Sequence, residues 1–143
     1  MKKSFLAACL MLFVVGLASA QGKFKGVWQN LDDEDGKPKS HLEIFEEKGE
    51  MKVKVIKLLP GAKSKTCTEC TGALKNKPIE GMYLVNGMKK VSDKEYDDGE
   101  ILNPKNGKVY SCNMTLVDDN TIKVRGYIGF SLIGKTQYWY RVK

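Results

Sequence analysis

The sequence predicts an all-β protein, a single antiparallel up-and-down β-barrel or strongly curved sheet of about eight strands. Apolar and polar residues alternate with a period of two in several runs, most clearly over residues 108–117. Such alternation is typical of strands that bury one face. Turn-forming pairs such as Asn106-Gly107 and Asp118-Asp119 separate these runs. No run has the longer period of an amphipathic helix, so hairpins are expected to join most of the strands.

Eight runs carry the strand pattern. They are residues 24–30, 40–46, 51–59, 80–86, 100–103, 108–117, 121–128 and 135–142. In the third run, Met51 and Val53 share one face and Lys52 lies on the other. Residues 60–78 form the longest irregular stretch, and a loop of this length in a small domain is often functional or held covalently. Residues 87–97 are predicted to be a polar connection with at most one helical turn.

Residues 1–20 have the pattern of an export signal. Lys2 and Lys3 precede an apolar run over residues 6–17, and small residues end at Ala20. We therefore expect a signal peptide, cleavage after Ala20, and one β-barrel domain over residues 21–143. The apolar run is shorter than the roughly 20 residues that a membrane-spanning helix needs, so no membrane span is expected. The expected location of the domain is the periplasm or the extracellular space.

The net charge indicates which partners to expect. It is +7 at pH 7, and nearly all the positive charge comes from lysine, since the arginines are Arg125 and Arg141. Proteins that read nucleic-acid bases depend on arginine for paired hydrogen bonds, so nucleic acid is not an expected partner. The lysines alternate with apolar residues, as on a solvated sheet face. Their charge would attract anionic polymers of the cell envelope.

The sequence offers little support for catalysis. Its one histidine, His41, lies within an ordinary strand pattern. Neither a G-x-S-x-G nucleophile motif nor a glycine-rich phosphate loop is present. Asp33 and Asp35 suggest a calcium loop, but the register would put Leu31 at the first ligand position. We therefore predict a protein that is not an enzyme, with no catalytic residue, cofactor or metal.

Three cysteines follow residue 20: Cys67, Cys70 and Cys112. An exported protein meets an oxidising environment, so a disulfide is expected, and the odd number leaves one thiol over. Two pairings fit: Cys67 with Cys70, or Cys112 with either of them, which would tie the long loop to the sheet. A zinc site made by the three cysteines with His41 has suitable C-x-x-C spacing, but the compartment favours the disulfide.

Gly26 and Trp28 lie in the first expected strand, and Arg141 lies in the last. In a closed barrel the first and last strands meet. The guanidinium of Arg141 can then stack on the indole of Trp28, an interaction worth on the order of 1 kcal/mol. Gly26 and Arg141 are therefore expected to have structural roles.

The order of these motifs resembles the DUF2147 family of exported bacterial proteins of unknown function. The resemblance rests on G-x-W at Gly26, the C-x-x-C at Cys67, and the runs GEILNPKNGKVYSC, VRGYIGF and GKTQYWYRV. It extends over residues 26–142 and implies no activity. Gly26-x-Trp28 with a late Arg141 is also similar to the signature of lipocalin-like (calycin) barrels, which implies a lipocalin-like fold.

These observations favour a non-enzymatic envelope protein whose barrel mouth holds a small, partly apolar molecule. The expected lining residues are Trp28, Tyr110, Met114, Tyr138 and Trp139, although the same side chains would also serve to fill the core. The alternative is an interaction module that binds an envelope protein or an anionic polymer through the lysine-rich Cys67–Cys70 loop. An uncharacterised enzyme is the third interpretation.

Overall fold

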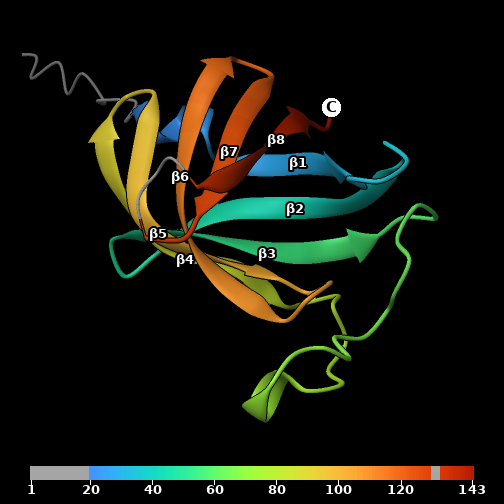
Figure 1. Ribbon diagram of the computed structural model, residues 1–143. Coiled ribbons are helices and arrows are strands. Elements are labelled where there is room, and N and C mark those ends of the chain that lie inside the picture. The colour runs from blue at the N-terminus through green and yellow to red at the C-terminus, as the bar shows by residue number, and fades with distance from the viewer. Residues whose placement is uncertain (1–19, 130–132) are drawn as a thin grey trace, which may run out of the picture.

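The computed structural model describes residues 20–129 and 133–143, in which eight antiparallel strands form one closed barrel (Figure 1). The strands are β1 (Gly26–Leu31), β2 (Pro38–Glu47), β3 (Glu50–Leu58), β4 (Tyr83–Ser92), β5 (Glu95–Asn103), β6 (Lys108–Asp118), β7 (Thr121–Tyr127) and β8 (Gly134–Arg141). Two short 3-10 turns, η1 (Ala20–Lys23) and η2 (Gly72–Leu74), are the helical elements of the described residues. Each strand pairs with its neighbour in sequence and β8 returns to β1, which confirms the predicted fold class.

Burial alternates along the strands because successive side chains point to opposite faces of a sheet. In β3, Met51, Val53 and Val55 are buried, while the lysines between them are half-buried on the outer face. In β6, Cys112 and Met114 are buried in the same way. The apolar stripes of the eight strands therefore meet in one core inside the barrel.

β4 and β5 are longer than the sequence pattern predicted. Instead of a polar connection over residues 87–97, β4 continues to Ser92, turns through Asp93 and Lys94, and returns as β5. The prediction was wrong because the last residues of β4 face solvent and show no apolar alternation. Backbone pairing, as between Lys89 and Asp97, does not require that alternation. The bounds of the other six strands lie within two residues of those predicted.

The barrel is closed at the end where β8 meets β1. Trp28 pairs with Arg141 across this junction, and the indole Nε1 of Trp28 donates a hydrogen bond of 2.8 Å to the carbonyl of Phe24. The Phe24 ring packs edge-on against Tyr96, with ring centroids 4.9 Å apart. Phe24 and Trp28 have no exposed surface, so aromatic side chains fill this end of the barrel.

The signal-peptide prediction concerns residues 1–20, of which residues 1–19 lie outside the described part of the chain. Cleavage after Ala20 therefore stays a prediction. Within the described part, neither helical turn has the length or the apolar character to cross a bilayer.

Candidate functional site

The end of the barrel opposite Phe24 and Trp28 is its mouth. Because the strands alternate in direction, the β1–β2, β3–β4, β5–β6 and β7–β8 connections all lie at this end. The β3–β4 connection, residues 59–82, is the longest, and Figure 1 shows it extending beyond the barrel wall. Long connections of this kind commonly carry binding residues.

A cavity of about 430 Å³ opens at the mouth. Its apolar lining is contributed by strands and connections on all sides, namely Val55, Leu58, Ala62, Ile79, Leu84, Ile101, Leu102, Ile128, Ile133 and Trp139. Small-molecule sites are usually concave, mostly apolar and roughly 300–1,000 Å³ in volume. The mouth half of the barrel therefore has the size and lining of a small-ligand site, while aromatic side chains fill the other half.

A few polar side chains lie among the apolar ones. The Ser40 hydroxyl donates a hydrogen bond to Asn30 Oδ1, and both residues are buried. The indole Nε1 of Trp139 donates to Gln137 Oε1 at 3.1 Å. All four residues line the cavity. Fixed polar groups in an apolar cavity can orient a ligand by hydrogen bonding to it.

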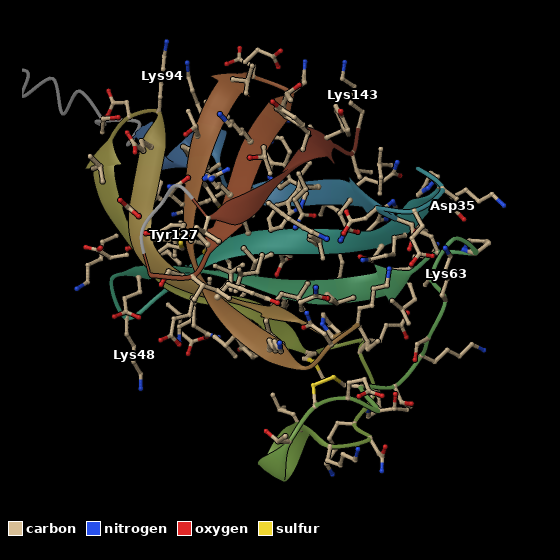
Figure 2. All side chains as sticks on the ribbon, viewed as in Figure 1. Asp35, Lys48, Lys63, Lys94, Tyr127 and Lys143 are labelled. Atoms are coloured by element: carbon tan, nitrogen blue, oxygen red, sulfur yellow. A yellow bond between two sulfur atoms is a disulfide. The ribbon has the colours of Figure 1, made fainter. Side chains whose placement is uncertain are left out.

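Five charged residues form a network at the mouth, which we name the rim ion cluster: Asp32, Glu34, Asp35, Lys63 and Lys105. The Lys63 ammonium lies 3.1 Å from Asp32, 2.9 Å from Glu34 and 3.6 Å from Asp35. The Lys105 ammonium contacts Glu34 as well. Figure 2 labels Asp35 and Lys63, which come from different connections. The cluster thus joins the β1–β2, β3–β4 and β5–β6 connections around the mouth.

The rim ion cluster changes the acid–base properties of its members. Hydrogen bonding from the backbone N–H of Glu34, followed by that from Lys63, lowers the pKa of Asp32 to about 2. The neighbouring Lys105 and Lys63 also lower the pKa of Glu34. The same contacts raise the pKa of Lys63 and of Lys105. All these groups are therefore charged near neutral pH, when each can form its ion pair.

Of the five residues predicted to line the cavity, two do so and three do not. Tyr110 and Trp139 line the cavity, and the Tyr110 hydroxyl accepts a 2.7 Å hydrogen bond from Asn106 Nδ2. Trp28 and Met114 are fully buried and are not among the lining residues. Tyr138 is 44% exposed because it follows Gln137 and precedes the buried Trp139, which places it on the outer face of β8. The lining prediction is corrected for these last three residues.

Several lining residues were not predicted from the sequence. Ser40, Leu42 and Ile44 occupy alternate positions of β2 and therefore share one face. The sequence pattern thus indicated that the polar side chain of Ser40 faces inward. No comparable signal places Lys63 beside Asp32, since 31 positions separate them. Asp32 belongs to the acidic turn between β1 and β2, yet its side chain is only 6% exposed.

Gly26 and Arg141, the two residues for which the sequence suggested structural roles, lie side by side at the closed end of the barrel. Arg141 donates hydrogen bonds to the backbone carbonyls of Lys23, Lys25 and Asp119. A Cβ at Gly26 would lie 3.3 Å from Nη1 of Arg141, and the positive φ of Gly26, +124°, strains any other residue there. Gly26 therefore leaves room for the guanidinium at the closed end.

The structure chooses between the two cysteine pairings. Cys67 and Cys70 form the disulfide, and Cys112 is a free, buried thiol. Cys112 lies beside Met88, with the sulfur atoms 3.4 Å apart, and burial raises the pKa of its thiol to about 12. A zinc site with His41 is excluded because Cys67 and Cys70 are bonded to each other. No other group of three His, Cys, Asp or Glu side chains in residues 20–129 and 133–143 is arranged to hold a metal.

The disulfide-bonded segment of the β3–β4 connection packs against the β5–β6 turn. The sulfur of Cys67 lies 3.6 Å from the carbonyl oxygen of Pro104. A Cβ at Gly107 would lie only 1.9 Å from the carbonyl oxygen of Glu69, so the two backbones are in close contact. This packing fixes the base of the long connection beside the cavity.

Comparisons with known proteins agree with this geometry. The family model DUF2147, described as an uncharacterized protein conserved in bacteria, matches residues 26–141. Among solved structures, the protein HP1028 from Helicobacter pylori, described as belonging to the lipocalin family, has a TM-score of 0.74 and 23% sequence identity. That match covers 84% of this chain and 83% of the other. At this identity it shows the fold alone, a lipocalin-like barrel.

Two further comparisons add nothing to the assignment. A redesigned β-barrel matches with a TM-score of 0.49 and 17% identity, covering 87% of this chain and 96% of the other, and this similarity carries no argument. A search of curated proteins found no match.

Proposed function

Since this chain belongs to the DUF2147 family and folds as a lipocalin-like barrel, we propose that it is an exported, non-enzymatic protein that binds a small, partly apolar molecule. The proposed place of action is the cell envelope, either the periplasm or the surface. The ligand enters through the mouth and lies against the apolar interior. The observation that carries this proposal is the cavity of about 430 Å³ with its apolar lining.

The shape of the barrel supports a bound molecule over a merely packed core. Aromatic side chains fill the closed end, yet the mouth half keeps an open cavity lined by Val55, Leu84 and Ile101. An apolar surface that faces water is unfavourable by about 25 cal/mol for each Å². A ligand that covers this lining recovers that free energy, and the rim ion cluster holds the mouth in shape for it.

A fluorescence titration with N-phenyl-naphthylamine, a neutral apolar dye, tests the proposal. We expect saturable binding to the wild-type protein. Replacing Ile101 with Trp fills part of the cavity and should weaken binding at least tenfold. Gly126→Leu is a second filling variant, because an added Cβ there meets Ile101 only at 3.4 Å. Circular dichroism confirms that each variant is folded.

Val117→Trp is the matched control, since Val117 lies on the outer face of β6 and is 56% exposed. It adds the same side chain outside the barrel and should leave the affinity unchanged. Equal affinity in Ile101→Trp and in the wild-type protein would place the dye elsewhere and contradict binding in the barrel.

The β3–β4 connection supports a second candidate function, an interaction module for an envelope protein or an anionic polymer. It extends beyond the barrel wall (Figure 1). The Cys67–Cys70 disulfide constrains it, and it exposes Leu74 together with Lys65 and Lys77. The double variant Lys65→Glu, Lys77→Glu tests this function by salt elution from a polyanion column. Earlier elution would support the interaction module, whereas unchanged elution would remove it. Ile101→Trp should elute like the wild-type protein in either case.

A further inference from the structure

We propose that the barrel ligand is a single-chain amphiphile with an anionic head group, and that Lys135 is the residue that receives this head group. The inference deepens the proposed function and rests on it. The apolar chain lies against the interior, and the head group stays at the mouth. Three features of the lining support this assignment.

The first feature is the direction of Lys135. Trp139, Gln137 and Lys135 occupy alternate positions of β8 and all line the cavity. Their exposure rises in that order, from 1% for Trp139, through a half-buried Gln137, to an exposed Lys135. The three side chains therefore follow the cavity wall from its apolar depth to the mouth. A ligand lying along this wall meets an indole, then an amide, then an ammonium group.

The second feature is the space beside Lys135. Its partner across the β7–β8 pair is Gly126, which has no side chain and also lines the cavity. A lysine next to a larger residue would pack its methylene groups against that neighbour. Next to Gly126, the ammonium can turn toward the mouth and leave room for a head group.

The third feature is the distribution of charge. Four lysines line the cavity, and two of them, Lys63 and Lys105, are neutralised by the acids of the rim ion cluster. Lys39 and Lys135 form no ion pair with a carboxylate in the described part of the chain, and neither does the lining residue Asp33. The rim ion cluster itself has three carboxylates for two ammonium groups, so its excess charge is negative. On the other side of the mouth, Lys135 is the one charged lining residue that β7, β8 and the described part of their connection contribute, and its local positive charge favours an anionic head group there.

The position of the charge explains why the ligand must be amphipathic. An anion taken wholly into the apolar interior would lose its hydration without a buried partner, which is strongly unfavourable. At the mouth the anion keeps water on one side and meets Lys135 on the other. The apolar chain gains from burial, and each buried methylene is expected to tighten binding about fourfold.

Isothermal titration with three probes of equal chain length tests the inference: dodecanoate, dodecanol and dodecyltrimethylammonium. We expect dodecanoate to bind about 1.5- to fivefold more tightly than dodecanol, the range of one exposed charge pair. The cationic probe should bind more weakly than dodecanol. Lys135→Met should remove the preference for dodecanoate and leave the affinity for dodecanol unchanged, because it keeps an apolar side chain of similar length.

Lys123→Met is the matched control, since Lys123 is exposed on β7 and does not line the cavity. It should keep the preference of the wild-type protein. Equal affinities for the three probes, or tightest binding of the cationic one, would overturn the anionic assignment and leave the proposed barrel function standing. Failure of all three probes to bind would overturn both. A preference for dodecanoate that survives Lys135→Met would overturn the role of Lys135.

Discussion

The guanidinium carbon of Arg141 lies over the indole ring of Trp28, 4.3 Å from the ring centroid, at the position where the last strand pairs with the first. The same guanidinium donates to the carbonyls of Lys23 and Asp119, so one side chain joins the N-terminal segment, β1, β8 and the β6–β7 turn. Only a few backbone contacts hold β1 to β8, since Trp28 and Gln29 are the residues of β1 in that pairing. Closure of the barrel therefore depends strongly on this contact.

Replacing Arg141 with Ala should lower the free energy of unfolding by about 2–3 kcal/mol, because it removes both the stacking and several charge-assisted hydrogen bonds. Arg141→Lys should recover only a small part, since an ammonium lacks the planar fork of donors. Urea denaturation measures both values. Lys123→Ala, a change on the outer face, is the control and should have little effect. A loss below about 0.5 kcal/mol in Arg141→Ala would show that closure does not depend on this residue.

The Cys67–Cys70 disulfide closes a very short loop, so its removal should cost only about 2 kcal/mol and leave the barrel folded. The expected change is local: in the variant Cys67→Ser, Cys70→Ser, amide hydrogens of residues 59–82 should exchange faster, while those of β6 and β7 stay protected. Hydrogen exchange with mass spectrometry makes the comparison. Cys112→Ala is the control and should keep the slow exchange of the connection. Global unfolding of the double serine variant would contradict a local role.

The rim ion cluster should make stability depend on pH in the acidic range. A carboxyl whose pKa is lowered on folding stabilises the protein above its unfolded value and loses that effect as the pH falls through the folded value. For Asp32 these values are 3.8 and about 2, so the loss should occur between about pH 4 and pH 2. We expect Asp32→Asn to lower the melting temperature at pH 7. The melting temperature of this variant should also change less with pH between about pH 4 and pH 2 than that of the wild-type protein.

Thermal melts at pH 7, 4 and 2 measure this effect. Asp33→Asn is the control, because Asp33 has no ion pair in the described part of the chain, and its melting profile should follow that of the wild-type protein. Parallel pH profiles for Asp32→Asn and the wild-type protein would show that the cluster contributes nothing to stability.

The thiol of Cys112 should not react with alkylating reagents while the protein is folded. Its pKa is raised to about 12, so almost none of it is thiolate at pH 8. Its side chain is also fully buried, so the reagent cannot reach the sulfur. Alkylation by iodoacetamide, followed by mass spectrometry on protein with the Cys67–Cys70 disulfide intact, should proceed only in urea. Fast labelling of the folded protein would indicate that the barrel opens around β6.

Much of the fold could be predicted because strand alternation and turn residues are local properties of a sequence. They located six of the eight strands within two residues, as in β3 with its Met51, Val53 and Val55 stripe. They failed over residues 87–97, where β4 and β5 pair through their backbones with mostly polar side chains. Backbone hydrogen bonds hold such a hairpin without any apolar pattern.

The sequence by itself determined the all-β class, the inward face of strands such as β3 and β6, and the meeting of Trp28 with Arg141, since a closed sheet must bring its first and last strands together. Only the tertiary structure decided which cysteines pair, which aromatic residues line a cavity and which fill the core. It also decided that Lys63 neutralises Asp32 while Lys135 faces the mouth without a carboxylate partner among the described residues. These relationships join distant segments, and the barrel geometry alone sets the distances between them.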